Sequence, residues 1–177
     1  MNQSKQEYAE SYGEGCAEFY DEIYGAVSQN MIAALCGLAG GGRVLELGVG
    51  TGRVALPLAA RGADICGIEA SPAMISKLRD KPGGRETPVI KGNFATVQPK
   101  GSFSLILTLV STFFLLRSRN EQQCFHSVSR LLPERGIFLI ETFKPIGAIE
   151  MARNGQDGSL EKTYTVEQVL DKEIGLR

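Results

Sequence analysis

The hydrophobic positions of the chain follow two alternating patterns. Short, nearly continuous apolar runs predict buried strands, and the segments between them carry apolar residues every three or four positions, as helices do. The strands are predicted at residues 43–47, 64–69, 87–91, 103–110 and 136–142, and the helices between them at about residues 52–60, 71–81 and 119–132. This alternation indicates an α/β fold: a doubly wound, mostly parallel sheet of five or six strands with helices on both faces.

Local signals mark several helix ends. Ser71 followed by Pro72 is an N-cap residue followed by the residue best suited to the first helical position. Ser118 and Glu121 have the spacing of a capping box, which predicts the start of the last helix. Pro57 is expected to weaken the early turns of the first helix.

The two ends of the chain are less regular. Residues 17–38 predict one or two helices, whose candidate buried positions are Phe19, Ile23, Val27, Ile32 and Leu35. Beyond the fifth strand, residues 146–153 predict a helix, and residues 162–170 fit either a strand or a helix.

Composition narrows the classes of function. The net charge of -1 provides no bulk attraction to nucleic acid or to an anionic membrane, so neither is expected as a partner. No apolar run is long enough to cross a bilayer and the N-terminus has no signal-peptide core, so we expect a cytoplasmic protein. The four cysteines are widely separated and the chain has a single histidine, so neither a metal site nor a disulfide framework is expected.

Candidate chemistry gathers where the first two strands end. Gly48, Gly50 and Gly52 follow the first strand, where glycines allow positive φ angles and let a ligand approach the backbone. The following helix start adds unpaired N–H groups that favour an anionic group. Glu69 ends the second strand, where an acid typically accepts hydrogen bonds from ribose hydroxyls. The ligand is therefore expected to contain a ribose.

Two classes of cofactor fit such a site: dinucleotides and S-adenosylmethionine. Dinucleotide sites carry GxGxxG, whose third glycine allows close packing of helix and strand. This chain has GxGxG instead, with Arg53 at the third dinucleotide position. Glu46, two residues before the first glycine, would repel a pyrophosphate but would attract the ammonium group of a methionine moiety. The pattern therefore favours S-adenosylmethionine.

The same residues carry a family resemblance. VLELGVGTGRVALPLA at residues 44–59 resembles the first motif of the class I S-adenosylmethionine-dependent methyltransferases, which have a Rossmann-like fold. The resemblance continues through FYDEIY, GIEAS, GNF, LTLVSTFFLL and FHSVSRLLPERGIFLIETF, and it spans residues 19–143. It implies a helical lid segment at residues 1–40, a cofactor-binding core at residues 41–143 and a C-terminal extension at residues 144–177.

Residue by residue, the resemblance implies a cofactor site. Its members would be Tyr20 in a lid, Glu46 near the methionine amine, Gly48, Gly50, Thr51 and Gly52 at the glycine turn, Glu69 at the ribose, Ala70, Met74, Asn93 and Phe94 around the adenine, and Leu109 and Val110 beside the methionine. Two positions depart from the family. Asn93 stands where an aspartate is usual, and Ser111–Thr112 stands where small-molecule members often have Asn-Thr.

The resemblance implies transfer of a methyl group to a small molecule by in-line displacement. No catalytic residue is assigned, because the cofactor is already activated and the protein mainly aligns the acceptor and excludes water. Glu141 is a candidate base, whereas His126 is more typical of an exposed helical histidine. Phe113 and Phe114 fit either a substrate wall or core packing.

The C-terminal end leaves alternatives open. Family members usually continue beyond the fifth strand for longer than the 34 residues found here, in positions 144–177. One alternative is therefore a non-catalytic or split S-adenosylmethionine-binding module, and a less favoured one is a nucleotide-linked oxidoreductase. An exposed sheet edge would also favour a homodimer.

Overall fold

The protein is built around one six-stranded sheet. The computed structural model describes residues 5–96, 99–116, 118–141 and 164–168. The strands are β1 (Val44–Leu47), β2 (Ile65–Glu69), β3 (Val89–Lys91), β4 (Leu105–Thr108), β5 (Ile137–Glu141) and β6 (Tyr164–Gln168), in the order β3-β2-β1-β4-β5-β6. Strands β1 to β5 are parallel, and β6 pairs antiparallel with β5. The predicted mostly parallel sheet is confirmed, and the ambiguous C-terminal segment contains a strand.

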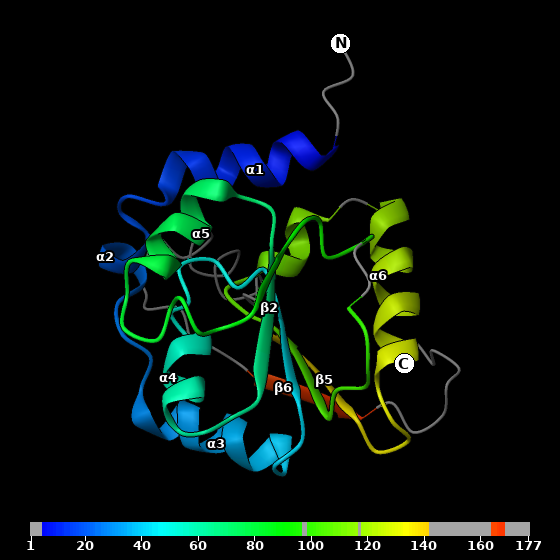
Figure 1. Ribbon diagram of the computed structural model, residues 1–177. Coiled ribbons are helices and arrows are strands. Elements are labelled where there is room, and N and C mark those ends of the chain that lie inside the picture. The colour runs from blue at the N-terminus through cyan, green and yellow to red at the C-terminus, as the bar shows by residue number, and fades with distance from the viewer. Residues whose placement is uncertain (1–4, 97–98, 117, 142–163, 169–177) are drawn as a thin grey trace, which may run out of the picture.

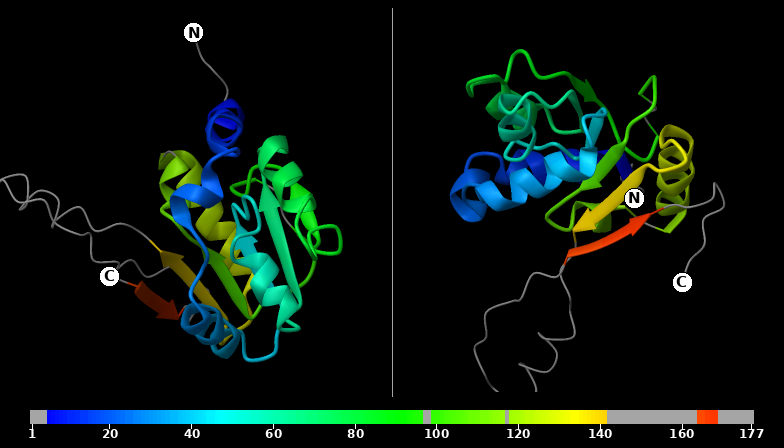
Figure 2. Two further views of the ribbon diagram at one scale, coloured as in Figure 1. Left: turned by 90° about the vertical axis from the view of Figure 1, so that its left-hand side faces the viewer. Right: turned by 90° about the horizontal axis from the view of Figure 1, so that it is seen from below.

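Helices cover both faces of this sheet (Figures 1 and 2). They are α1 (Lys5–Cys16), α2 (Tyr20–Tyr24), α3 (Gln29–Ala39), α4 (Ala55–Ala60), α5 (Pro72–Arg79) and α6 (Ser118–Leu131), with a short 3₁₀ helix, η1 (Thr112–Leu115). One core cluster joins one face of the strands to α3, α4 and α5, and a second joins the other face to α6. The doubly wound arrangement is therefore confirmed.

The central strands are buried because helices cover both of their faces. All four residues of β4 are buried, Leu105 and Leu107 in the first cluster and Ile106 in the second. This alternation explains why its sequence is an unbroken apolar run. The strand order reverses between β1 and β4, and ligands of such sheets bind at the carboxyl ends of the strands beside this point.

The ends of the helices follow local chemistry. The Ser71 hydroxyl accepts a hydrogen bond from the Met74 N–H (3.3 Å), as the predicted N-cap requires. Helix α4 begins at Ala55, three residues later than predicted, because Gly52 has a φ of 77° that no helix accommodates. Pro57 then falls in the first turn, where its missing N–H has no intrahelical partner to lose.

The N-terminal region departs most from expectation. Helix α1 begins well before the predicted helical region and lies across the edge of the sheet at which the parallel strands end, beside α5 (Figure 1). Ile32 and Leu35 are buried as predicted, but Phe19 and Ile23 are 57% and 67% exposed. The prediction of buried side chains at those two positions is wrong. Ile23 lies in the five-residue α2, which has no buried residue, and Phe19 is the residue that precedes this helix.

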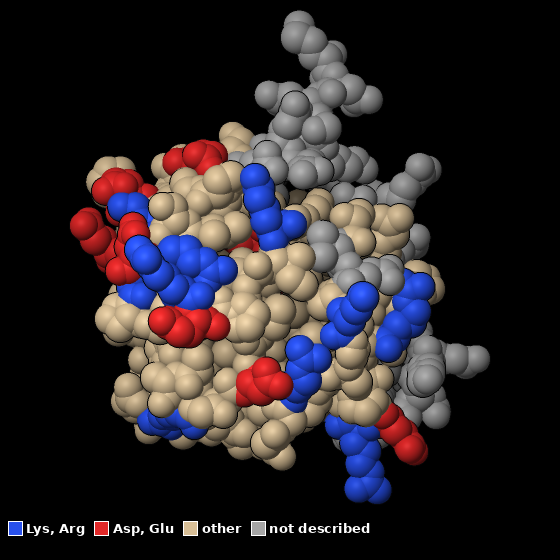
Figure 3. All heavy atoms as spheres, viewed as in Figure 1, with Lys and Arg blue, Asp and Glu red and all other residues tan. Residues whose placement is uncertain are grey.

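Acidic residues fasten the N-terminal region to α5. A Cβ atom at Gly13 would collide with the Ser71 side chain, so α1 touches α5 at a position where only glycine fits. The Glu14 carboxylate accepts from the Ser71 hydroxyl and from the Ala73 N–H at the start of α5. Further along, Glu18 pairs with Lys77 (2.6 Å). Figure 3 shows acidic and basic side chains next to each other at the upper left, over these helices.

Several predictions concern residues that the structure does not describe. The helix expected at residues 146–153 and the side chains of Ser118 and Glu121 lie outside the described residues, as does the side chain of Phe114. Within the described part of the chain, no helix is long and apolar enough to cross a membrane. The same residues contain no cluster of three or more metal-ligating side chains. All four cysteines are free thiols.

Candidate functional site

The glycine turn after β1 has the backbone that the sequence predicts. Gly48, Gly50 and Gly52 have φ angles of 74°, 55° and 77°, which residues with a side chain rarely adopt. They differ in their surroundings. A Cβ atom at Gly48 would collide with the Thr112 methyl group, and one at Gly52 would lie 2.9 Å from Cγ of Leu56. One at Gly50 would have no atom within 4 Å, so open space at this turn lies beside Gly50.

Glu69, at the end of β2, holds this turn in place. Its Oε2 accepts from the Gly50 N–H (2.9 Å), and its Oε1 accepts from the N–H groups of Ala70 and Ser71 (both 2.9 Å). A carboxylate has about four lone-pair sites, so acceptor capacity is left for a further donor. Burial raises the pKa of Glu69, although these three backbone hydrogen bonds oppose the rise. The sequence identified this acid but not its bond to Gly50.

Glu46 is the second buried acid of the site. Its side chain is 4% exposed, and its Oε2 has no hydrogen-bond partner. Burial raises its pKa from 4.5 to about 8, with a further contribution from the Glu69 charge and opposition from Arg53. A buried carboxyl oxygen without a partner is costly, and a cation brought next to it would provide the missing partner.

Tyr20 lies close enough to Glu46 and Arg53 for their charges to act on it. It begins α2, is half-buried and packs against Tyr24 in a tilted arrangement with 4.6 Å between ring centres. Burial raises its pKa, and the neighbouring Arg53 and Glu46 charges act on it in opposite directions. The structure therefore brings the predicted lid tyrosine, Arg53 and Glu46 together.

The side chain of Thr51 is engaged with the N-terminal region. It is fully buried, and its hydroxyl donates to Asp21 of α2 (2.6 Å). Lys81 joins the two, because its ammonium pairs with Asp21 (2.6 Å) and donates to the Thr51 carbonyl (2.8 Å). Burial of Asp21 opposes its ionisation, but the bonds from Lys81 and Thr51 outweigh that effect and lower its pKa. Sequence reasoning assigned Thr51 to the cofactor and missed this connection, which joins positions far apart in the chain.

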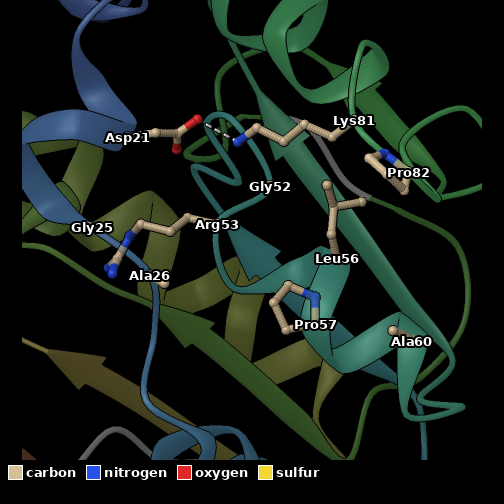
Figure 4. Close-up of a pocket in the computed structure, with 10 residues that line it drawn as sticks. All are labelled: Asp21, Gly25, Ala26, Gly52, Arg53, Leu56, Pro57, Ala60, Lys81 and Pro82. Carbon is tan, nitrogen blue, oxygen red and sulfur yellow. Dashed lines mark ion pairs between the residues drawn. The ribbon is translucent and has the colours of Figure 1, made fainter.

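A hollow opens beside this connection (Figure 4). It is lined by Asp21, Gly25, Ala26, Gly52, Arg53, Leu56, Pro57, Ala60, Lys81 and Pro82. Asp21 and Lys81 face each other across its upper part, and the Arg53 side chain extends toward Gly25 and Ala26 (Figure 4). The guanidinium of Arg53 lies 5.9 Å from the centre of the Tyr24 ring. The hollow therefore borders the glycine turn on the side of α4.

The residues predicted around the adenine are held by their own neighbours. Ala70 and Met74 are buried, and Cγ of Met74 lies 3.2 Å from where a Cβ of Gly13 would be, so α1 covers this wall. The Asn93 side chain accepts from the Ala95 N–H (2.9 Å), which an aspartate at that position could do equally well. Phe94 is buried in the core cluster shared with α6.

The end of β4 contributes a strained bend. Leu109 is buried in the core, whereas Val110 and Ser111 have φ angles of 54° and 56°, unusual for residues with side chains. The Val110 N–H donates to Oε2 of Glu141 (3.1 Å) and the Ser111 N–H to its carbonyl oxygen (3.2 Å). Sequence reasoning considered Glu141 as a base and did not find this bend, for which the sequence has no glycine signal.

The remaining candidates have structural surroundings. Phe113 packs against Phe125 (5.2 Å between ring centres) and Phe138 (6.4 Å), which favours core packing over a substrate wall. His126 is exposed on α6.

Comparison with known proteins identifies the family. The methyltransferase domain matches residues 44–136, more than half of the chain. The chain belongs to this family of methyltransferase domains. An uncharacterized methyltransferase of Geobacillus sp. strain WCH70 is 35% identical over 122 residues, which cover 67% of this chain and 54% of the relative.

Solved methyltransferases share the fold. CcbJ from Streptomyces caelestis has a TM-score of 0.68 and 34% identity over 82% of this chain and 61% of its own. The glycopeptide N-methyltransferase MtfA, solved with S-adenosylmethionine, has a TM-score of 0.58 and 22% identity over 71% of this chain and 53% of its own. The chain spans about half the length of the curated relatives it matches.

Proposed function

We propose that the protein binds S-adenosylmethionine and transfers its methyl group to a small-molecule acceptor. The buried Glu46 carboxyl carries this proposal. Its unpartnered Oε2 lies in the strand that leads into the glycine turn, and Glu69, close enough to affect its pKa, ends the neighbouring strand. Two neighbouring carboxyls disfavour the pyrophosphate of a dinucleotide but suit a ligand that has an ammonium group and ribose hydroxyls.

The residues at the carboxyl ends of the strands fit this ligand. Glu46 would hold its ammonium group, and Glu69 would use its remaining acceptor capacity for the ribose. The open side of Gly50 would admit the ligand to the backbone. The other members of the site predicted from the sequence remain part of this proposal, with Tyr20 as a lid residue.

The chemistry requires little from side chains. Bound S-adenosylmethionine supplies a methyl group that is already activated as a sulfonium. The protein would contribute alignment and exclusion of water. Helix α1 and the short α2, fastened to α5 and to Thr51, are placed to exclude water from the strand ends. This placement supports a lid role for α1 and α2, whereas α3 packs in the core cluster. The division into a lid segment at residues 1–40, a cofactor core at residues 41–143 and an extension at residues 144–177 remains part of the proposal.

The proposal also covers the cellular location and the self-association of the protein. The free thiols support a reducing compartment, and we keep the cytoplasm as the proposed location. Among the described strands, β6 occupies the edge next to β5, so self-association would use β6 or β3.

Calorimetry with S-adenosylhomocysteine tests the proposal. The wild type is expected to bind it and to ignore NAD. Glu46→Gln, which cannot ionise, should weaken binding about tenfold or more, because the wild-type carboxyl can give up its proton beside the ammonium group of the ligand and form a charge-assisted contact, whereas the amide cannot. Glu134→Gln, an exposed acid in the turn before β5, is the matched control and should change nothing. Tight NAD binding without affinity for S-adenosylhomocysteine would reject the proposal.

Turnover separates an enzyme from a binding module. Methyl-labelled S-adenosylmethionine would be offered with a panel of small molecules, beginning with amines because MtfA is named as an N-methyltransferase. Labelled product supports the enzyme. Binding without transfer to any member of the panel supports the non-catalytic or split module instead.

A further inference from the structure

The bend after β4 lies at the reversal of strand order. Strand β4 pairs with β1, and the chain segments leaving these two strands meet where Thr112 approaches Gly48. A side chain at Gly48 would collide with the Thr112 methyl group, so the two segments are in direct contact. The position of Thr112 therefore determines one wall of the crevice in which doubly wound sheets bind their ligands.

The path of the chain to Thr112 depends on an unfavourable backbone. Val110 and Ser111 immediately precede Thr112, and both adopt left-handed φ angles, 54° and 56°. A single such residue is uncommon outside glycine, and two in succession persist only where surrounding contacts hold them. The contacts that hold Val110 and Ser111 therefore determine the position of this wall of the crevice.

Glu141 supplies two of these contacts. Its Oε2 accepts from the Val110 N–H at 3.1 Å, and its main-chain carbonyl accepts from the Ser111 N–H at 3.2 Å. The residue ends β5, which pairs with β4, so the acceptors rest on a rigid strand. Its side chain is only 6% exposed, which suits an oxygen that fixes a neighbouring backbone.

We propose that Glu141 is a positioning residue that holds the left-handed bend at Val110 and Ser111 and thereby sets the crevice between the segments that follow β1 and β4. In this role the residue needs an acceptor oxygen next to the Val110 N–H, not the ability to take up a proton. The inference about ligand affinity rests on the proposed function, whereas the inference about the bend does not.

Two substitutions of similar volume separate the acceptor from the charge. Glu141→Gln keeps an oxygen that can accept from the Val110 N–H, and Glu141→Met fills the same space without a strong acceptor. Glu134→Met, at an exposed position three residues before β5 begins, tests the general effect of replacing an acid by methionine. Adding Ser111→Gly to Glu141→Met tests the strain, because glycine adopts positive φ without penalty.

Amide hydrogen exchange of residues 109–116 reads the bend directly in the ligand-free full chain. Exchange should be slow in the wild type and in Glu141→Gln, and at least about tenfold faster in Glu141→Met, because the Val110 N–H then loses its acceptor. The added Ser111→Gly should recover part of the protection. Equal exchange in wild type and Glu141→Met would overturn the proposal, and so would fast exchange of this segment in the wild type.

Calorimetry with S-adenosylhomocysteine measures whether the bend affects ligand affinity. Affinity should fall about tenfold in Glu141→Met and stay within about threefold of wild type in Glu141→Gln. An unchanged affinity in Glu141→Met, with the bend released, would show that the bend does not shape the site and would overturn that half of the proposal. If the wild type itself does not bind S-adenosylhomocysteine, the proposed function fails, while the exchange experiment still decides the role of Glu141.

Discussion

The buried Glu46 carboxyl makes the stability of this protein depend on pH. Its pKa rises from an ordinary value of 4.5 to about 8 in the folded chain, mainly through burial. A group whose pKa is raised on folding favours the folded state below its unfolded pKa, and this contribution is lost as the pH rises through the folded pKa. The loss should therefore develop between about pH 4.5 and pH 8 and then level off.

The magnitude follows from the two pKa values. Each pH unit between them changes the free energy of unfolding by about 1.4 kcal/mol, so the complete loss approaches roughly 5 kcal/mol. Glu46→Gln removes the titration while keeping the shape. The buried amide leaves a donor without a partner, at a cost of about 1–3 kcal/mol that does not vary with pH. We expect the variant to be less stable than the wild type near pH 4.5 and more stable above pH 8.

Urea unfolding followed by circular dichroism at half-unit steps from pH 4.5 to 9 measures this difference. Subtracting the wild-type curve cancels every group that titrates equally in both proteins. The subtracted curve should rise by several kcal/mol and flatten near pH 8. A curve that stays flat across this range would refute the reasoning, because Glu46 would then ionise as easily in the folded chain as in the unfolded one.

Three further predictions concern the glycine turn and the N-terminal helices. Gly50→Ala should lose most affinity for S-adenosylhomocysteine in calorimetry, because the new methyl group occupies the open side of the turn. Gly62→Ala, also at positive φ with open space around it, is the control and should keep its affinity. Gly13→Ala should lower the melting temperature, because the added Cβ forces α1 away from α5. Gly15→Ala on the same helix should raise the melting temperature, since its added Cβ meets no atom and alanine favours the helix by about 1 kcal/mol over glycine. Asp21→Asn should remove the ion pair with the lysine after α5 and speed amide exchange in α2, while changing overall stability by less than about 1 kcal/mol because the pair is partly exposed.

A specific result would contradict each of these three predictions. Equal binding by the two turn variants would place the ligand elsewhere. Melting temperatures that shift in the same direction for both α1 variants would mean that α1 does not pack on α5 as described. Unchanged exchange in α2 would show that the Asp21 contact does not fasten this helix.

The sequence predicted those features that local chemistry determines. The Ser71 cap, the buried run of β4 and the glycine turn each depend on residues within a few positions of one another, and all three are found. The position of Glu69 at the end of β2 was also predicted, whereas its role at a ribose stays a prediction.

Features that depend on distant parts of the chain could not be predicted in this way. The bond from the Gly50 N–H to Glu69 spans 19 positions, and the bond from Thr51 to Asp21 spans 30. The exposure of Phe19 and Ile23 depends on where α2 rests, which periodicity does not reveal. The bend at Val110 is imposed from β5 by Glu141, 31 positions away, and the residues of the bend give no sign of it.

The bond between Glu69 and Gly50 has a consequence for how quickly a ligand is captured. Because Glu69 fixes the turn from within the chain, association does not have to order this loop and loses little conformational entropy at this point. Ordering of this turn should then impose no plateau on the rise of the capture rate with ligand concentration.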